Sequence, residues 1–157
     1  MTTSRIQLAL NVTDVEAATR FYSDLFGVGP AKRRPGYANF VIADPPLKLV
    51  LFDNPGAAAP LNHLGVEVAS TTDVVAAAGR FAAAGLRHTR TEADRCCHAV
   101  QDKVWVDAPD VPLGAWEFYT VLSDDAGQTE EECTSGSCCA GTSSDAGRCC
   151  AETAQEA

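Results

Sequence analysis

The pattern of apolar and polar positions predicts a repeated unit, beginning with a strand over residues 6–12. Asp14 is expected to cap a helix that ends at Gly27. The apolar positions with helical spacing in this segment are Val15, Ala18, Phe21, Tyr22 and Leu25. Further strands are predicted over residues 31–34, 37–42 and 47–52, because turn-forming residues separate three short apolar runs. The predicted order is βαβββ.

The same order is predicted again from residue 63, at an offset of 56 residues when Gln7 is laid on His63. Thr71 or Thr72 is expected to cap an alanine-rich helix that stops at Gly85. Strands then follow over residues 87–91, 97–102 and 115–121. We therefore expect one α+β domain over residues 5–122, with modules of about 5–53 and 61–122.

The segment 123–157 has no apolar periodicity and is rich in glycine, serine, threonine, alanine, acids and cysteine. Such a composition buries too little apolar surface to offset chain entropy, so we expect a disordered tail. Its eight acidic residues and single Arg148 carry −7 of the net charge of −9, which leaves the domain nearly neutral. Neither part has the basic surface that nucleic acids require. The chain lacks a run of about 18 apolar residues or an apolar leader, so we expect a cytoplasmic protein without a membrane partner.

Three polar residues of the predicted strands are candidate metal ligands. Gln7 and His63 fall on the polar sides of their strands, and Glu117 lies between Trp116 and Phe118. A carboxylate in such a strand is costly to bury without a partner, and a metal ion would supply one. The alternative is that His63 is a core histidine with satisfied hydrogen bonds and that Gln7 is an interior amide.

The seven cysteines are the second chemical feature, and their odd number argues against a disulfide framework. Adjacent pairs of cysteines suit a soft element that binds two thiolates, although a free cysteine is more often a small buried hydrophobic residue. The cysteines are Cys96 and Cys97 in the domain, and Cys133, Cys138, Cys139, Cys149 and Cys150 in the tail.

A duplicated βαβββ unit resembles the vicinal-oxygen-chelate superfamily, which includes glyoxalase I, extradiol dioxygenases and bleomycin-resistance proteins. The resemblance implies that the two modules enclose a metal site with ligands from the first and fourth strand of each. Carried onto this chain, the ligand positions are Gln7, Leu49, His63 and Glu117, of which Leu49 cannot bind a metal. The remaining oxygen-rich set suits Fe(II), Mn(II) or Ni(II) better than structural zinc and leaves open positions for dioxygen and substrate.

Several longer runs resemble the bacterial carbon–arsenic lyase family, of which the cadmium-induced proteins are a related branch. The runs are RRPGYANF at 33–40, DPPLKLVLF at 44–52, LNHLGVE at 61–67, CC at 96–97 and QDKVWV at 101–106. The resemblance covers residues 5–122. It implies an Fe(II)-dependent dioxygenase that converts methylarsenite and trivalent aromatic arsenicals into arsenite.

In that assignment Gln7, His63 and Glu117 hold the iron as the catalytic set, while Cys96 and Cys97 bind the arsenic of the substrate. The tail cysteines Cys138, Cys139, Cys149 and Cys150 would capture metalloid as an accessory site. The superfamily pairs its modules within or between chains, so a monomer and a homodimer both stay open.

Two other functions stay open from the sequence. A glyoxalase-type isomerase or lyase would use the same metal site, but it needs a fourth ligand and has no use for Cys96 and Cys97. A cadmium- or arsenite-binding resistance protein without turnover would depend on the cysteines and tolerate replacement of Glu117.

Overall fold

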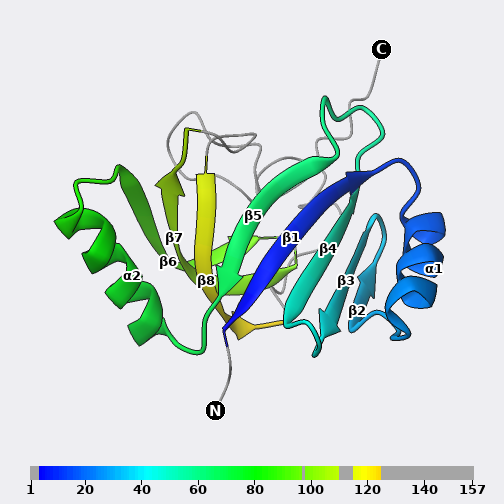
Figure 1. Ribbon diagram of the computed structural model, residues 1–157, viewed down its shortest axis with the longest axis horizontal. Coiled ribbons are helices and arrows are strands. Elements are labelled where there is room, and N and C mark those ends of the chain that lie inside the picture. The colour runs from blue at the N-terminus through cyan, green and yellow to red at the C-terminus, as the bar shows by residue number, and fades with distance from the viewer. Residues whose placement is uncertain (1–3, 97, 110–114, 125–157) are drawn as a thin grey trace.

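The structure, a computed structural model, describes residues 4–96, 98–109 and 115–124. A strand, a helix and three strands occur twice in succession, as predicted (Figure 1). The first module consists of β1 (Arg5–Val12), α1 (Val15–Phe26), β2 (Lys32–Arg34), β3 (Tyr37–Ile42) and β4 (Leu47–Asp53). The second consists of β5 (Leu61–Glu67), α2 (Thr71–Ala83), β6 (His88–Cys96), β7 (Ala99–Asp107) and β8 (Ala115–Ser123).

The strands of the described chain form one eight-stranded sheet in the order β2-β3-β4-β1-β5-β8-β7-β6. In each module the first strand pairs in parallel with the last, β1 with β4 and β5 with β8. The antiparallel pairing of β1 with β5 joins the two modules at the centre of the sheet. The two helices lie at opposite ends of the molecule, each beside the strands of its own module (Figure 1). The predicted α+β class with two βαβββ modules is confirmed.

Helix α1 begins and ends where its sequence predicts. The Asp14 side chain accepts a hydrogen bond of 2.9 Å from the Ala17 amide, and Gly27 ends the helix in the left-handed region at φ 66°. The predicted apolar face is partly wrong, because Phe21 and Leu25 are 59% and 58% exposed. The residues of α1 that pack against the sheet are Val15, Ala18, Tyr22 and Phe26, whose spacing follows one helical stripe.

Helix α2 is capped by Ser70 and not by either threonine after it. The Ser70 side chain accepts from the Asp73 amide, whereas the Thr71 hydroxyl donates to the buried Asp102 carboxylate of β7. A tertiary partner for Thr71 cannot be seen in the local pattern of serines and threonines. The buried face of α2 packs against β7 through Val74, Ala77 and Phe81.

Strands β6 and β7 are longer than the predicted segments 87–91 and 97–102. Residues after Thr91 continue β6 because they pair with β7, despite a register shift between Thr91 and Asp94. Ala93 lies at this irregularity with φ 46°, and its amide donates a 2.8 Å hydrogen bond to Asp102. The pairing partner, and not apolar alternation, makes this segment a strand.

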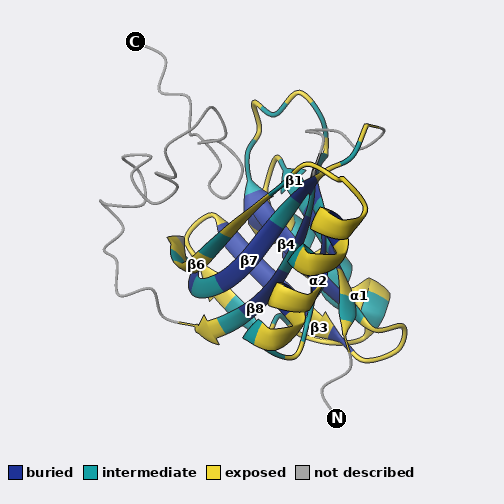
Figure 2. Ribbon diagram, turned by 90° about the vertical axis from the view of Figure 1, so that its left-hand side faces the viewer, coloured by how far each residue is buried: buried dark blue, intermediate teal, exposed yellow. Residues whose placement is uncertain are grey.

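Each helix covers an apolar core on one face of the sheet, and strands such as β4 and β7 are largely buried while the outer sides of the helices are exposed (Figure 2). The opposite face carries buried polar residues, among them Gln7, His63 and Glu117. That face is where chemistry is possible, because a buried polar group must find a partner there. None of the helices described in the structure is long and apolar enough to cross a membrane.

Gly65 of β5 lies between β1 and β8, where it pairs with Gln7 on one side and with Glu117 on the other. A Cβ atom there would lie 3.0 Å from the Glu117 carbonyl oxygen and 3.4 Å from the Gln7 Cβ. We predict that Gly65→Ala lowers the free energy of unfolding by about 1–3 kcal/mol, because backbone atoms must move to admit the methyl group. Urea denaturation of the metal-free protein measures this change.

Gly79 provides the matched control, since it lies inside α2 and a Cβ there would meet nothing within 4 Å. Gly79→Ala should raise stability by about 0.5–1 kcal/mol through helix propensity. A Gly65→Ala protein as stable as the unmodified chain would contradict the close approach of β1, β5 and β8.

Candidate metal centre

Strands β1, β5 and β8 bring Gln7, His63 and Glu117 together, although the three residues are far apart in the sequence. The Gln7 Nε2 atom lies 2.9 Å from His63 Nε2 and 3.2 Å from Glu117 Oε2, and the last two atoms are 3.3 Å apart. Each residue is at most 5% exposed. Three polar side chains from three strands therefore meet at one buried point.

This triangle has the dimensions of a shared coordination site. Donor atoms that bind one ion at about 2.1 Å in adjacent octahedral positions lie about 3 Å from one another. The Gln7 amide presents its nitrogen to the triangle, while its oxygen accepts from the Tyr119 hydroxyl. A half-turn of the amide exchanges the two atoms, and a hydroxyl can equally accept from the amide nitrogen. The residues present fit a divalent ion.

The amide of Gln7 is essential to this arrangement. Among the described histidine, cysteine, aspartate and glutamate side chains, no group of three lies close enough to hold an ion. His63 and Glu117 alone supply two donors, and Gln7 supplies the third. Three donors leave room for further ligands, which a closed structural site does not.

The Glu117 carboxylate is 4% exposed, and it keeps its negative charge because the side chains of Lys103 and His63 face it. Burial by itself raises its pKa, but Lys103 and then His63 outweigh burial and lower the pKa to about 2. Lys103 Nζ lies 3.5 Å from Glu117 Oε1 and 2.5 Å from Asp94 Oδ2, and this lysine is only 2% exposed. The carboxylate is therefore ionised and ready to bind a cation.

Tyr119 is fully buried on β8, and its hydroxyl donates to the Gln7 amide oxygen. Burial raises the pKa of Tyr119 well above 10, and the carboxylates of Glu67 and Glu117 raise it further. The phenol therefore stays protonated and can hold the Gln7 amide. Lys103 and Tyr119 both contact the triangle of Gln7, His63 and Glu117, Lys103 through Glu117 and Tyr119 through Gln7.

The fourth ligand position predicted from the sequence is wrong by one residue. Leu49 is buried in the core beneath α1 and not in the pocket. Ala9 of the first module corresponds to Gly65 of the second, at the 56-residue offset. Ala9 pairs with Val50 on β4, and Gly65 pairs with Glu117 on β8, so Val50 is the residue equivalent to Glu117. Val50 lines the pocket but cannot bind a metal. The first module therefore still lacks a metal-binding residue at the fourth position, but the residue at that position is Val50 and not Leu49.

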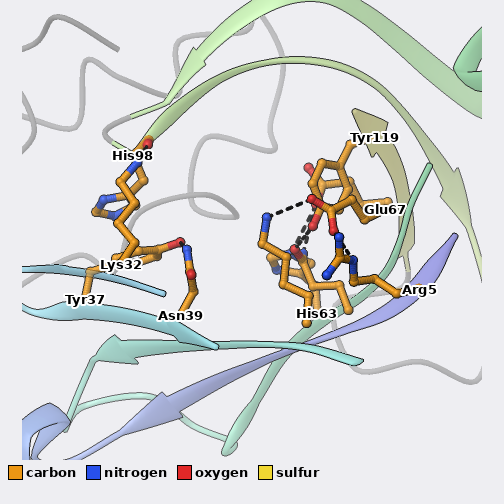
Figure 3. Close-up of polar contacts among 11 residues, drawn as sticks. Arg5, Lys32, Tyr37, Asn39, His63, Glu67, His98 and Tyr119 are labelled. Carbon is orange, nitrogen blue, oxygen red and sulfur yellow. Dashed lines mark hydrogen bonds and ion pairs between the residues drawn. The ribbon is translucent and has the colours of Figure 1, made fainter. Parts of the chain in front are cut away.

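The pocket extends from the triangle to strands β2 and β3 and to the turn between β6 and β7. His98 lies in this turn and stacks on Tyr37 of β3, with ring centroids 3.8 Å apart and planes inclined by 15°. Burial lowers the pKa of His98 to about 4, and Lys32 and Arg34 contribute, so its ring is neutral near pH 7. In Figure 3 His98, Lys32, Tyr37 and Asn39 lie together, apart from the cluster of His63, Glu67, Arg5 and Tyr119.

Two further residues lie beside the site, Lys32 at the pocket and Trp105 at the His63 ring. Lys32 lines the pocket, and its ammonium group donates to the carbonyl oxygens of His98 and Asp124, so it is not a simple surface residue. Trp105 is half-buried, and its ring makes an edge contact with the His63 ring, with the ring centroids 5.3 Å apart. Only strand pairing brings these residues to the site, so local sequence carried no signal for them.

The structure describes little of the predicted arsenic-binding residues. Cys96 is the last residue of β6 and pairs through its backbone with Ala99, which lines the pocket. Its side chain and the whole of Cys97 lie outside the described structure. The tail cysteines Cys133, Cys138, Cys139, Cys149 and Cys150 also lie outside the described residues.

Comparisons with known proteins agree with this geometry. Cadmium-induced protein CadI of Mycobacterium tuberculosis is 60% identical over 121 residues, which cover 77% of this chain and 78% of the relative. The trivalent organoarsenical cleaving enzyme of Thermomonospora curvata is 51% identical over 137 residues, 87% of this chain and 88% of the relative. The crystal structure of homoprotocatechuate 2,3-dioxygenase from Arthrobacter globiformis shares the fold, with a TM-score of 0.51 and 23% identity over 76% of this chain and 35% of that one.

The sequence profile of the Glyoxalase/Bleomycin resistance protein/Dioxygenase superfamily matches residues 5–110, which span both modules as far as the end of β7. This match agrees with the duplicated βαβββ order of the structure. The chain belongs to the glyoxalase, bleomycin-resistance and dioxygenase superfamily, with trivalent organoarsenical cleaving enzymes and cadmium-induced proteins among its close relatives.

Proposed function

We propose that this protein is an Fe(II)-dependent dioxygenase that cleaves the carbon–arsenic bond of trivalent organoarsenicals and releases arsenite. The observation that carries the proposal is the buried triangle of Gln7, His63 and Glu117 at one end of a pocket. The pocket is also lined by His98, Ala99 and Gln101, which follow the adjacent Cys96 and Cys97 in the sequence. A relative 51% identical is named as a trivalent organoarsenical cleaving enzyme.

In this proposal the side chains of Gln7, His63 and Glu117 hold the metal as the catalytic set. Fe(II) bound there would activate dioxygen beside the carbon attached to arsenic. Lys103 keeps Glu117 ionised, and Tyr119 fixes the amide of Gln7. The reaction balances without another reductant, because methylarsenite and one dioxygen molecule contain the same atoms as arsenous acid and formaldehyde.

The vicinal thiols of Cys96 and Cys97 would bind the arsenic of the substrate. Trivalent arsenic is soft and prefers thiolates, whereas the amide, imidazole and carboxylate set is harder and suits iron. Ala99 and His98 line the pocket and belong to the same hairpin, which supports a position of the thiols near the metal. Holding both partners in one pocket gives the proximity that the reaction requires.

A binding protein without turnover is the second candidate, favoured by the 60% identity to a cadmium-induced protein. Cadmium is also thiophilic, so the same cysteines would serve it. This function needs no oxygen-activating site and gives no role to the buried Glu117 carboxylate with its lysine partner. A glyoxalase-type isomerase is less suited, since Val50 occupies the position of a fourth ligand.

Aerobic incubation with Fe(II) and methylarsenite should yield arsenite and formaldehyde, measured by arsenic speciation and a formaldehyde assay. Glu117→Ala should reduce turnover by more than about 100-fold, because an iron ligand is lost, while arsenic binding to the thiols persists. Cys96→Ser should have the opposite effect, with iron binding kept and arsenic affinity lost. The matched control is Glu16→Ala, which removes an exposed carboxylate that pairs only with Arg33 in the described contacts. Turnover by both site variants would contradict the proposed chemistry.

Lys103 tests the charge balance of the metal site. Lys103→Met leaves the buried Glu117 carboxylate without its cation, and we expect a loss of about 3–5 kcal/mol in the metal-free protein. A divalent ion replaces the missing positive charge, so Co(II) should raise the melting temperature of this variant more than that of the unmodified protein. Differential scanning calorimetry with and without Co(II) measures both effects. Equal stabilisation of the two proteins would show that the ion binds away from Glu117.

The cysteine pairs Cys138-Cys139 and Cys149-Cys150 would serve as an accessory site that captures metalloid. Removal of residues 125–157 should therefore lower the rate at low methylarsenite concentration, because capture raises the local substrate concentration. The rate at saturating substrate should not change. Unaltered kinetics at low substrate after truncation would rule out the capture role and leave the proposed reaction untouched.

A further inference from the structure

The β1–β5 pairing contains an irregularity directly beside the candidate ligand His63. Ala9 lies opposite His63, but the next pair is Leu10 with Leu61, so Asn62 is the extra residue of a β-bulge. Successive strand residues ordinarily point to opposite faces, yet Asn62 and His63 are 6% and 5% exposed and touch each other. The bulge gives the histidine a buried amide neighbour that a regular strand would direct to the other face.

The contact between these residues continues into a directed chain of hydrogen bonds. Asn11 Nδ2 donates 3.0 Å to the carbonyl oxygen of Ala59, which can only accept. This leaves Asn11 Oδ1 to accept from Asn62 Nδ2 at 2.9 Å, and so Asn62 Oδ1 faces His63 Nδ1 at 2.7 Å. Because an amide oxygen cannot donate, the ring nitrogen must carry the proton. The backbone carbonyl of Ala59 thus sets the orientation of every group up to the imidazole.

The second ring nitrogen, His63 Nε2, lies beside a carboxylate that favours the other tautomer. His63 Nε2 lies 3.3 Å from the Glu117 carboxylate, which would attract a proton to Nε2 in an imidazole without other partners. A protonated Nε2 has no lone pair for a metal. The chain through Asn62 places the proton on Nδ1, and Nε2 then accepts from the Gln7 amide at 2.9 Å in the absence of metal.

We propose that Asn62, oriented by Asn11, is a positioning residue that selects the Nδ1-protonated tautomer of His63 and so keeps Nε2 open to the metal. The inference rests on the proposed function in that it takes His63 as a metal ligand. It adds two residues that touch neither metal nor substrate. Hydrogen-bond partners of this kind orient metal-ligating histidines in general, and their loss costs roughly 10–100-fold in metal affinity.

The test uses the full chain, labelled with ¹⁵N-histidine and free of metal, near pH 8.5. Only three histidines are present, and His88→Gln and His98→Gln variants assign the signals. Long-range ¹H–¹⁵N spectra should show His63 protonated at Nδ1. In Asn62→Leu, which keeps the side-chain size, the proton should move to Nε2, and the Kd for Co(II) should rise about 10–100-fold.

Variants of Asn11 separate orientation from simple loss of a contact to the ring. Asn11→Ala frees the Asn62 amide to turn, and a mixture of tautomers with an intermediate Co(II) Kd is expected. Asn11→Asp keeps the acceptor for Asn62 and should retain the Nδ1 proton. Asn54→Ala is the control, because its side chain reaches the same Asn11 oxygen at 3.4 Å but is not on the path to His63.

An Nε2-protonated His63 in the unmodified metal-free protein would overturn the inference. An unchanged tautomer and Co(II) affinity in both Asn62→Leu and Asn11→Ala would do the same. The proposed function fails by a separate result, namely no arsenite from methylarsenite while the tautomer and Co(II) results are as expected. If Asn62→Leu does not fold, the unmodified protein and the Asn11 variants still decide the question.

Discussion

The buried negative charge of Glu117 constrains the architecture around it. A carboxylate at 4% exposure must be compensated, and the described structure does so with Lys103 and with polar atoms of His63 and Gln7. These three partners come from three different strands, β7, β5 and β1, so compensation depends on how the modules join. The central β1–β5 pairing, with Gly65 giving room between Gln7 and Glu117, is what makes the charge tolerable.

The two βαβββ modules have the same fold, but the residues on their polar faces differ, and this difference shapes the candidate metal site. The two modules share element order, sheet pairing and a helix over an apolar core. Their polar faces differ, because Val50 occupies the position that Glu117 holds in the second module. Three donors therefore meet where a fully symmetric pair of modules would supply four. A three-donor site leaves open positions, which suits a reaction more than storage.

In the proposed function, one pocket would hold both the iron ion and the arsenic of the substrate. The triangle of oxygen and nitrogen donors lies on the central strands, which the sheet holds rigidly. Strand β6, which Cys96 ends, forms the hairpin with β7 at the sheet edge, and His98 of this hairpin stacks on Tyr37 of the other module. This contact ties the hairpin to β3, so the pocket is bounded by both modules.

The sequence by itself determined the repeated βαβββ order, the N-cap of α1 and the three polar residues that meet, because alternation and capping are local properties. Tertiary structure alone decided that Val50 and not Leu49 faces the pocket, that Lys103 compensates Glu117, and that Asn62 bonds to His63. A strand's register and its bulges depend on which strand pairs beside it, and a shift of one residue reverses the face that each side chain presents. Such pairings join residues far apart in the chain, so no local pattern contains them.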